Sequence, residues 1–295
     1  MKIIDNLRLV KDKNGLIRLQ GLFSKKKLLK YYKEEYFNKS PVNYKKTYTD
    51  LEIKSKLINF RIYYFFIKKF FQKKINCLEI GCGEGYGARY LSNKTNYTGV
   101  ELDNFSIKKH NYNYYKRIKF YKGDFLSIKN IKNNYYNAII FNGVFEHLPN
   151  LKKTMKFIDR TIKKGGLVFI NVPNDFNILQ NHYLRTNRIK KKDAPWVSFE
   201  HINYFNKHSL SNIFKEKYSK ISIMADYPID QFLLNDNTNY YKKKKFGKIA
   251  NSIRMKFHTL FLDSKLIPIK NYINFCEAAA KINLGRTLTA CFRKI

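Results

Sequence analysis

Short apolar runs alternate with amphipathic helical patterns through the middle of the chain, from about residue 74 to residue 228. The runs are too continuous for strands with one face in water, which predicts strands buried on both faces of a sheet. Leu151, Met155 and Ile158 recur at helical spacing between two such runs. The pattern therefore predicts an α/β fold, a doubly wound sheet with helices on both faces. The predicted strands cover residues 76–80, 97–103, 118–122, 137–141, 167–172, 221–224 and 288–292.

The first of these strands runs directly into a glycine-rich turn. Gly81, Gly83, Gly85 and Gly87 stand at alternate positions, and a helical pattern follows over residues 86–91. Because glycine has no Cβ atom, the backbone and its N–H groups can come close to a ligand at the carboxyl edge of a parallel sheet. We therefore expect a crevice for a small ligand at this turn, with backbone N–H groups facing the ligand.

The identity of that ligand is open from the turn alone. The strict dinucleotide pattern G-x-G-x-x-G is absent, but Gly83, Gly85 and Ala88 meet its looser form, so a nicotinamide or flavin ligand remains open. A glycine turn that binds nothing is a further alternative. The fuller pattern, E-x-G-x-G-x-G, resembles motif I of the class I S-adenosylmethionine (SAM) dependent methyltransferases. This resemblance implies SAM as the cofactor and a cofactor turn made of Glu79, Gly81, Cys82, Gly83 and Gly85.

An acidic residue ends the second predicted strand. In a doubly wound sheet, a carboxylate at this place can accept hydrogen bonds from both hydroxyls of a ligand's ribose. We assign this role to Glu101, with Leu102 beside it. Asp103 is more suited to cap the helix that starts near Phe105, and a solvated strand-end acid is the alternative for Glu101. Because SAM and NAD both carry a ribose, this acid does not distinguish between them.

Asp124 and Phe125 follow the third predicted strand. In class I methyltransferases an acid at this point meets the adenine amino group, and an apolar neighbour packs against the ring. The resemblance therefore implies adenine binding by Asp124 and Phe125. A plain loop acid is the alternative for Asp124.

The fourth predicted strand runs into Asn142 and Gly143, and a glutamate–histidine pair ending at His147 follows. Similar methyltransferases carry such a pair close to the methionine end of the cofactor, which favours SAM over a dinucleotide. His147 is a candidate general base, because imidazole titrates near neutral pH, or else a structural histidine. Some related enzymes hold a divalent metal here with additional acids. Gly143 and Phe145 stand where those acids would help, so we expect no metal site.

A long connection, residues 174–205, leaves the fifth strand at the edge where ligands bind. It carries the only tryptophan, Trp196, and several other aromatic residues, which argues against disorder. Its sequence, from V-P-N-D-F to E-H-I-N-Y-F, resembles methyltransferases found in bacterial surface-polysaccharide gene clusters. The resemblance implies that this acceptor loop walls the acceptor site, with His201 and Tyr204 as the residues that face the acceptor. The alternative is that Tyr204 packs the loop onto the sheet and that His201 is satisfied internally.

Three segments lie outside the core, which we expect over residues 74–228 with the acceptor loop inserted. Residues 1–73 are expected to form an N-terminal helical segment, with a helix after Thr49 and a tyrosine-rich part. The resemblance suggests that this part closes over the cofactor as a lid, although aromatic packing explains it equally well. Residues 229–285 are expected to be a helical insertion, and residues 286–295 to contain the closing antiparallel strand of the class that the chain resembles.

The composition adds a strong positive charge. The formal net charge is +36, from 58 lysine and arginine residues against 22 acidic ones. The lysines are scattered, and the abundance of Lys, Ile, Asn and Tyr fits an AT-rich genome. A preference for anionic partners, such as nucleotide-linked sugars, anionic lipid or nucleic acid at low salt, is the other explanation. No pattern in the sequence indicates an oligomeric state.

The cysteines and the apolar runs indicate where in the cell the protein is expected. The four cysteines lack zinc-site spacing. Two of them, Cys77 and Cys291, fall in predicted buried strands and Cys82 falls in the cofactor turn, which suits reduced thiols. The most apolar stretch, residues 62–67, is too short to span a bilayer. We therefore expect a cytoplasmic protein, either free or peripheral at the inner membrane surface.

Together these patterns predict a SAM-dependent methyltransferase that acts on a sugar or glycan precursor, either free or nucleotide-linked. An RNA methyltransferase is the first alternative, although the sequence carries no recognisable RNA-binding module. A non-catalytic subunit with a methyltransferase-like fold is the second. The complete cofactor turn, with Glu101 and Asp124 after the later strands, argues against that second alternative.

Overall fold

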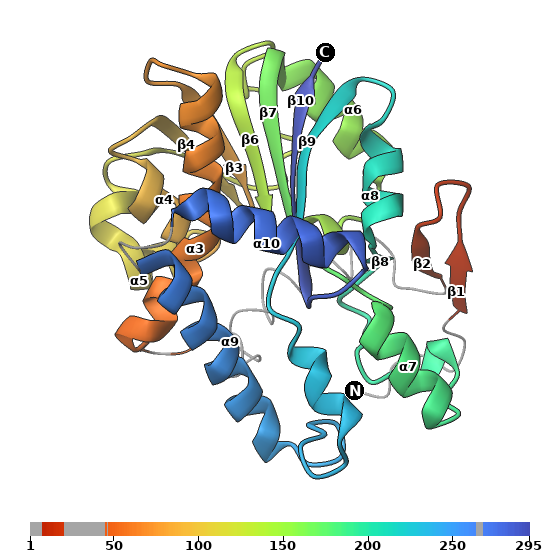
Figure 1. The fold of residues 1–295 in the computed structure, drawn as a ribbon. Helices are drawn as coiled ribbons and strands as arrows, with labels where there is room; N and C mark the ends of the chain where they lie inside the picture. Colours follow the sequence, from red (N-terminus) through yellow and green to blue (C-terminus); the bar gives the residue numbers. More distant parts are fainter. Residues whose placement is uncertain (1–7, 21–44, 46, 264–267) are drawn as a thin grey trace.

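The computed structural model describes residues 8–20, 45, 47–263 and 268–295. Its centre is a seven-stranded sheet in the order β5-β4-β3-β6-β7-β10-β9 (Figure 1). The first five of these strands run parallel, whereas β10 runs antiparallel to both of its neighbours. This confirms the predicted doubly wound, mostly parallel sheet. The strands are β3 Asn76–Ile80, β4 Asn96–Glu101, β5 Lys119–Lys122, β6 Tyr136–Asn142, β7 Ile162–Pro173, β9 Tyr218–Ala225 and β10 Thr287–Lys294.

Helices cover both faces of this sheet (Figure 1). Neighbouring residues along a strand point to opposite faces, so Cys77 and Leu78 of β3 belong to two different apolar cores. Residues of α3, α4 and α5 fill one core, and residues of α6 and α8 fill the other. The helices are α3 Asp50–Phe70, α4 Tyr86–Leu91, α5 Phe105–Tyr115, α6 Leu151–Thr161, α7 Ile178–Thr186, α8 Lys207–Phe214, α9 Lys245–Asp263 and α10 Ile269–Lys281.

A second sheet of three strands contains β1 (Arg8–Lys11), β2 (Ile17–Gln20) and β8 (Asn203–Tyr204), in that order. It joins an N-terminal hairpin to the end of the acceptor loop, because β2 pairs antiparallel with β8. The acceptor loop also contains α7, so it is a folded unit with secondary structure of its own.

This unit has an apolar core separate from the two cores of the main sheet. The core takes side chains from the hairpin, from the acceptor loop and from the short 3₁₀ helix Ile229–Leu234. We call the region built by these three segments the acceptor lobe. Its buried apolar residues are Leu19, Phe176, Tyr183, Leu184, Ala194, Trp196, Tyr204 and Leu233.

The N-terminal segment agrees only in part with the expected helical segment. α3 begins where the sequence predicts it, because Thr49 accepts a hydrogen bond from the backbone N–H of Glu52 and the Glu52 carboxylate accepts one from Thr49. Residues 8–20, however, form the β1–β2 hairpin instead of a helix. The tyrosine-rich part at residues 31–44 lies outside the described residues. The insertion at residues 229–285 is helical, as expected, and contributes α9 and α10.

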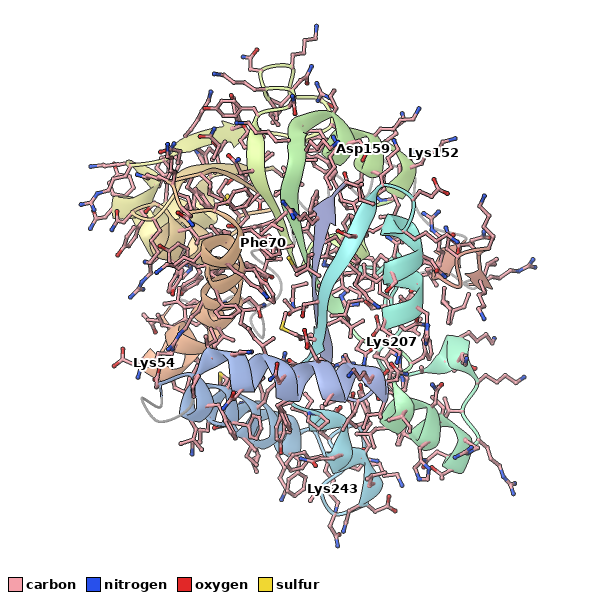
Figure 2. All side chains as sticks on the ribbon, turned by 45° about the horizontal axis from the view of Figure 1, so that its top comes forward. Lys54, Phe70, Lys152, Asp159, Lys207 and Lys243 are labelled. Atoms are coloured by element: carbon pink, nitrogen blue, oxygen red, sulfur yellow. The ribbon has the colours of Figure 1, made fainter. Side chains whose placement is uncertain are left out.

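Lysine side chains project from many separate elements (Figure 2). Lys54 lies on α3, Lys152 on α6 and Lys207 on α8, while Lys243 precedes α9. This spread matches the scattered lysines of the sequence. Among the helices that the structure describes, none is both long enough and apolar enough to cross a membrane.

The aromatic stack between α8 and the closing strand β10 offers a test of the fold. Phe214 and Phe292 stack with 4.2 Å between ring centroids, and each exposes 1% of its surface. Phe292→Ala should lower the free energy of unfolding by about 3–5 kcal/mol, because it removes a ring from a closely packed core. Ile295→Ala is the control, since Ile295 is 69% exposed, and its effect should stay within about 0.5 kcal/mol. Chemical denaturation measures both, and equal losses would contradict this packing role.

Candidate active site

A cavity of about 550 Å³ opens at the carboxyl ends of β3, β4 and β6. Its size is ordinary for a small-molecule or cofactor site. Most of the residues that the sequence assigns to the cofactor or to catalysis line it, whereas Gly85, His201 and Tyr204 do not. The assigned residues in its wall are Glu79, Gly81, Cys82, Gly83, Glu101, Leu102, Asp124, Phe125, Asn142, Gly143 and His147.

The glycines of the turn serve different purposes. A Cβ atom on Gly81 would lie 2.4 Å from a methyl carbon of Val144, and one on Gly85 would lie 2.5 Å from Ile107. Both glycines are therefore needed for packing. A Cβ atom on Gly83 would meet nothing within 4 Å, although its φ of +47° lies in the left-handed region. Gly83 is thus the position where a side chain would enter the cavity.

Gly87 makes room for a protein side chain rather than for a ligand. A Cβ atom there would lie 1.8 Å from a carboxylate oxygen of Glu79. That carboxyl group is 2% exposed and accepts a hydrogen bond from the Tyr97 hydroxyl. Burial raises the pKa of Glu79 to about 8. Glu79 therefore links β3 to β4 beneath the turn, at the inner wall of the cavity.

The N–H groups of the turn are occupied by the protein itself. Gly81 and Cys82 both donate to the carbonyl oxygen of Val100, at 2.8 and 3.1 Å, and Gly85 donates to Cys82 at 2.8 Å. Gly83 donates to the Glu101 carboxylate at 2.9 Å. The expectation that these N–H groups face a ligand is wrong for all four. Three of them hold the turn against β4 and the fourth closes the turn on itself, so these four are not donors to a ligand.

Glu101 stands between the turn and the cavity. One carboxylate oxygen accepts from Gly83, and the other accepts from the N–H of Leu102 at 2.7 Å. Burial raises the pKa of Glu101. Each carboxylate oxygen has two lone pairs, so each can still accept a second hydrogen bond from the cavity. Glu101 can therefore hold the turn and bind a ribose diol together.

Asp124 and Phe125 form another part of the wall. The Asp124 carboxylate accepts from the N–H of Leu126 at 3.0 Å. The Phe125 ring is 7% exposed and packs edge-on against Phe157, with 5.0 Å between centroids. Phe125 thus presents only a small part of its surface to the cavity, as an apolar floor.

Helix α3 supplies a wall that the sequence analysis did not identify. Asn59 and Tyr63 both donate to the side-chain oxygen of Asn142, each at 2.9 Å. Lys56, one turn earlier, also lines the cavity and pairs with Glu84 of the glycine turn at 2.8 Å. The sequence offers only a weak signal, because the polar residues at positions 55, 56 and 59 stand among other charged residues of the same helix.

Tyr48 adds a second contact from the N-terminal side. Its hydroxyl donates to the Glu84 carboxylate at 2.6 Å. Glu84 is 5% exposed, and its Oε1 also lies 3.3 Å from Nε2 of His110 in α5. The start of α3 is therefore fastened to the glycine turn through Glu84.

The two candidate histidines lie together, although they are far apart in sequence. Their ring centroids are 5.0 Å apart. Nδ1 of His147 lies 2.7 Å from the carbonyl oxygen of Glu200. Burial lowers the pKa of His147 to about 4 and that of His201 to about 3, so both rings are neutral at neutral pH. Nε2 of His147 lies 3.8 Å from Oε1 of Glu146, which is 4% exposed.

Tyr204 braces the acceptor loop. Its hydroxyl donates to the carbonyl oxygen of Ser198 and accepts from the Ser198 N–H, both at 3.0 Å. Only 1% of Tyr204 is exposed. These contacts agree with the packing alternative that the sequence left open for this residue.

The mostly parallel sheet of seven strands, with the last strand β10 antiparallel between β7 and β9, matches the class I methyltransferase fold. The family comparison agrees. Residues 54–217, more than half of the chain, match the family model described as a methyltransferase domain, and the chain belongs to this family.

Individual relatives are more distant. The uncharacterized protein MJ1252 of Methanocaldococcus jannaschii is 30% identical over 119 residues, which are 40% of this chain and 45% of that protein. The chain therefore spans less than half the length of this relative. A SAM-dependent methyltransferase from Archaeoglobus fulgidus is 16% identical, with a TM-score of 0.47, over 81% of this chain and 94% of that chain. Phosphoethanolamine N-methyltransferase 2 of Haemonchus contortus, solved with SAM, is 15% identical, with a TM-score of 0.49, over 94% of this chain and 61% of that chain.

Family membership confirms the enzyme class and selects SAM over a dinucleotide as the cofactor. The cavity fits SAM on two observations. Gly83 leaves the wall open where the cofactor approaches, and Glu101 retains acceptor capacity for two ribose hydroxyls. Asn142 and Gly143, at the end of β6, line the part of the cavity next to His147.

Gly83→Val should abolish detectable SAM binding, because a branched side chain would point into the cavity where no neighbour stands. Gly15→Val is the matched control. Gly15 also has a positive φ, of +79°, but lies in the β1–β2 turn, outside the cavity. The strain of a positive φ is therefore present in both variants. Calorimetry should show unchanged SAM affinity for Gly15→Val, and retained affinity in a folded Gly83→Val would contradict the assignment.

Glu101→Ala should weaken SAM binding by about 1–3 kcal/mol, because hydrogen bonds to a charged group are lost and the turn loses one of its ties. Asp103→Ala is the control. Asp103 caps α5 through the N–H of Phe105 and pairs with Lys122, outside the cavity wall. Equal SAM affinity for the two folded variants, measured by calorimetry, would show that Glu101 is only a structural acid.

Proposed function

We propose that this protein transfers the methyl group of SAM to a hydroxyl group of a sugar or glycan precursor, including one that carries phosphate. The main support is the lining of the cavity beyond Asn142. The wall there contains the polar side chains of His147 and Asn150 and the charged side chain of Lys153, beside the apolar Val144, Leu148 and Pro149. Hydroxyl-rich acceptors need such hydrogen-bonding partners, and an exposed lysine can pair with phosphate. The sequence resemblance of the acceptor loop to polysaccharide-cluster methyltransferases points to the same acceptor class.

The reaction is a displacement at carbon. Bound SAM supplies a methyl group on a positively charged sulfur. An acceptor oxygen held in line attacks that methyl group, the carbon–sulfur bond breaks, and the hydroxyl proton leaves. The contribution of the chain is to hold the two molecules in line, with the reacting atoms about 3–3.5 Å apart.

His147 is the best placed of the three candidate catalytic residues. It lines the cavity, and its Nδ1 faces the Glu200 carbonyl oxygen. Since a carbonyl only accepts, Nδ1 carries the hydrogen and the lone pair is at Nε2. We assign the contact with the acceptor hydroxyl to His147. His201 and Tyr204 are positioning residues, because His201 packs edge-on against the His147 ring and Tyr204 braces the loop that carries His201.

His147→Ala should reduce the rate of methyl transfer by about 10²–10⁴-fold, the range for loss of a proton-accepting group, while SAM affinity stays within about twofold. The acceptor is found first, by screening nucleotide-linked and free sugars with SAM that carries a labelled methyl group. His208→Ala, an exposed histidine at the start of α8, is the control and should retain full turnover. Transfer to RNA but to no sugar would replace the proposed acceptor class.

His201→Ala separates positioning from direct contact. A positioning role predicts a smaller loss of turnover than for His147→Ala. If His201→Ala loses more turnover than His147→Ala, the roles of the two histidines are reversed. Full turnover in both variants would remove histidine from the chemical step.

A further inference from the structure

We propose that Glu146, His147 and His201 bind a divalent transition-metal ion of the zinc type, at the junction of the cofactor cavity and the acceptor loop. From the sequence we expect no metal here, because Gly143 and Phe145 stand where the acids of related metal sites would help. The structure brings in a ligand from elsewhere, since His201 comes from the acceptor loop and lies beside the glutamate–histidine pair.

The three side chains have the right spacing and chemistry. One nitrogen or oxygen atom from each lies within 4.8 Å of those of the other two. Ligand atoms bonded to one ion at about 2.0–2.2 Å lie about 3–3.5 Å apart, so the ligand atoms need to approach one another by at most about 1.3–1.8 Å. Two imidazoles and one carboxylate are a recurrent ligand set for zinc and for non-haem iron, and imidazole favours these ions over magnesium or calcium.

Unpaired buried acceptors provide an independent observation. Oε2 of Glu146 and Nδ1 of His201 are buried and make no hydrogen bond, and neither carboxylate oxygen of the adjacent Asp175 makes one. Glu146 and Asp175 are 4% and 2% exposed. Buried polar atoms are nearly always paired, so a group of unpaired acceptors indicates a missing cation or water.

The backbone around the site is already held in place. The carbonyl oxygen of Glu146 accepts from the N–H of Ile202 at 2.9 Å, which joins the two segments that carry the ligands. Asn203, 0% exposed, donates to the carbonyl oxygens of Phe145 and Leu148 at 3.2 and 2.8 Å. The contact between Nδ1 of His147 and the Glu200 carbonyl directs Nε2 away from that carbonyl, as the second partner of a metal-binding histidine usually does.

The ion would lie at the wall of the cofactor cavity, because His147 belongs to that wall. The ion would take the Nε2 lone pair of His147, so in the metal-bound protein the acceptor oxygen contacts the ion in place of that nitrogen. Three protein ligands leave at least one coordination position open for this oxygen. This role in catalysis rests on the proposed function. The binding of the ion itself does not, and it can be measured without SAM or an acceptor.

The test is a titration of chelator-treated protein with Co²⁺, which reports nitrogen and oxygen ligands through its visible absorption bands. We expect one equivalent of Co²⁺ to bind, and Zn²⁺ to displace it. Trp196, 7% exposed in the same loop, should report binding through quenching of its fluorescence. Glu146→Gln and His201→Asn should each reduce the affinity by at least about tenfold, since even the loss of an outer partner commonly costs 10–100-fold.

The controls are His182→Asn and His208→Asn, which remove exposed histidines capable of weak surface binding. Both should bind Co²⁺ as the unchanged protein does. Thermal unfolding of each metal-free variant establishes that it folds, and Zn²⁺ should raise the melting temperature of the unchanged protein but not that of Glu146→Gln. If His201→Asn does not fold, the Co²⁺ affinity of the nearly isosteric Glu146→Gln variant tests the proposal alone.

The absence of a stoichiometric cobalt spectrum in the unchanged protein would overturn the proposal. So would an unchanged spectrum in Glu146→Gln, and in that case water is the better explanation for the unpaired atoms. Calorimetry with SAM on the same samples separates the two proposals. Metal binding without SAM binding would remove the proposed function and leave the metal site, and SAM binding without metal binding would do the reverse.

Discussion

The attachment of the glycine turn to the end of β4 determines the form of the site. Parallel pairing of β3 with β4 sets Ile80 opposite Val100. As a result, the Val100 carbonyl and the Glu101 carboxylate lie where the turn leaves β3, and together they accept three of its N–H groups. The turn is thereby held open next to a carboxylate that still has acceptor capacity. One pairing register thus produces both the space for the cofactor and the group that binds its ribose.

The remaining walls depend on side chains that connect distant segments. Asn142 at the end of β6 accepts from two residues of α3, and Glu84 of the turn accepts from Tyr48 and Lys56. These polar ties are largely buried, so their loss would leave unpaired groups and not merely a weaker contact. They hold α3 in place at the cavity. The N-terminal segment thus contributes to covering the cavity, as the resemblance suggested, and the described part that does so is the helix α3.

Most strands and helices of the core could be predicted from the sequence alone. Strand β3 and helix α4 begin and end where the apolar run and the glycine turn predict, because those signals are local. The β1–β2 hairpin could not be predicted in the same way. Its strands have four residues each, β1 has no buried residue, and the hairpin joins a sheet only by pairing with β8, which is far away in the sequence.

The site shows the same division between local and distant information. The positions of Glu101 and Asp124 follow from where strands end. The glycines at 81, 85 and 87 are required for another reason, because a Cβ atom at each would clash with a side chain that only the fold brings near. These side chains are Val144, Ile107 and Glu79. The pairing of His147 with His201 depends on Asn203, whose amide joins two loops. No spacing rule along the chain reports such a contact.

The acceptor lobe also affects the order of folding. Arg18 of the hairpin bonds to the side chain of Asn203, which is 185 positions away. A contact of this separation carries a large loop-closure cost unless the intervening chain is already compact. We therefore expect the main sheet to form first and to bring the lobe's segments together. In turn, we expect the acceptor lobe to assemble last and, with a small core of its own, to open at a lower free energy than the cofactor domain.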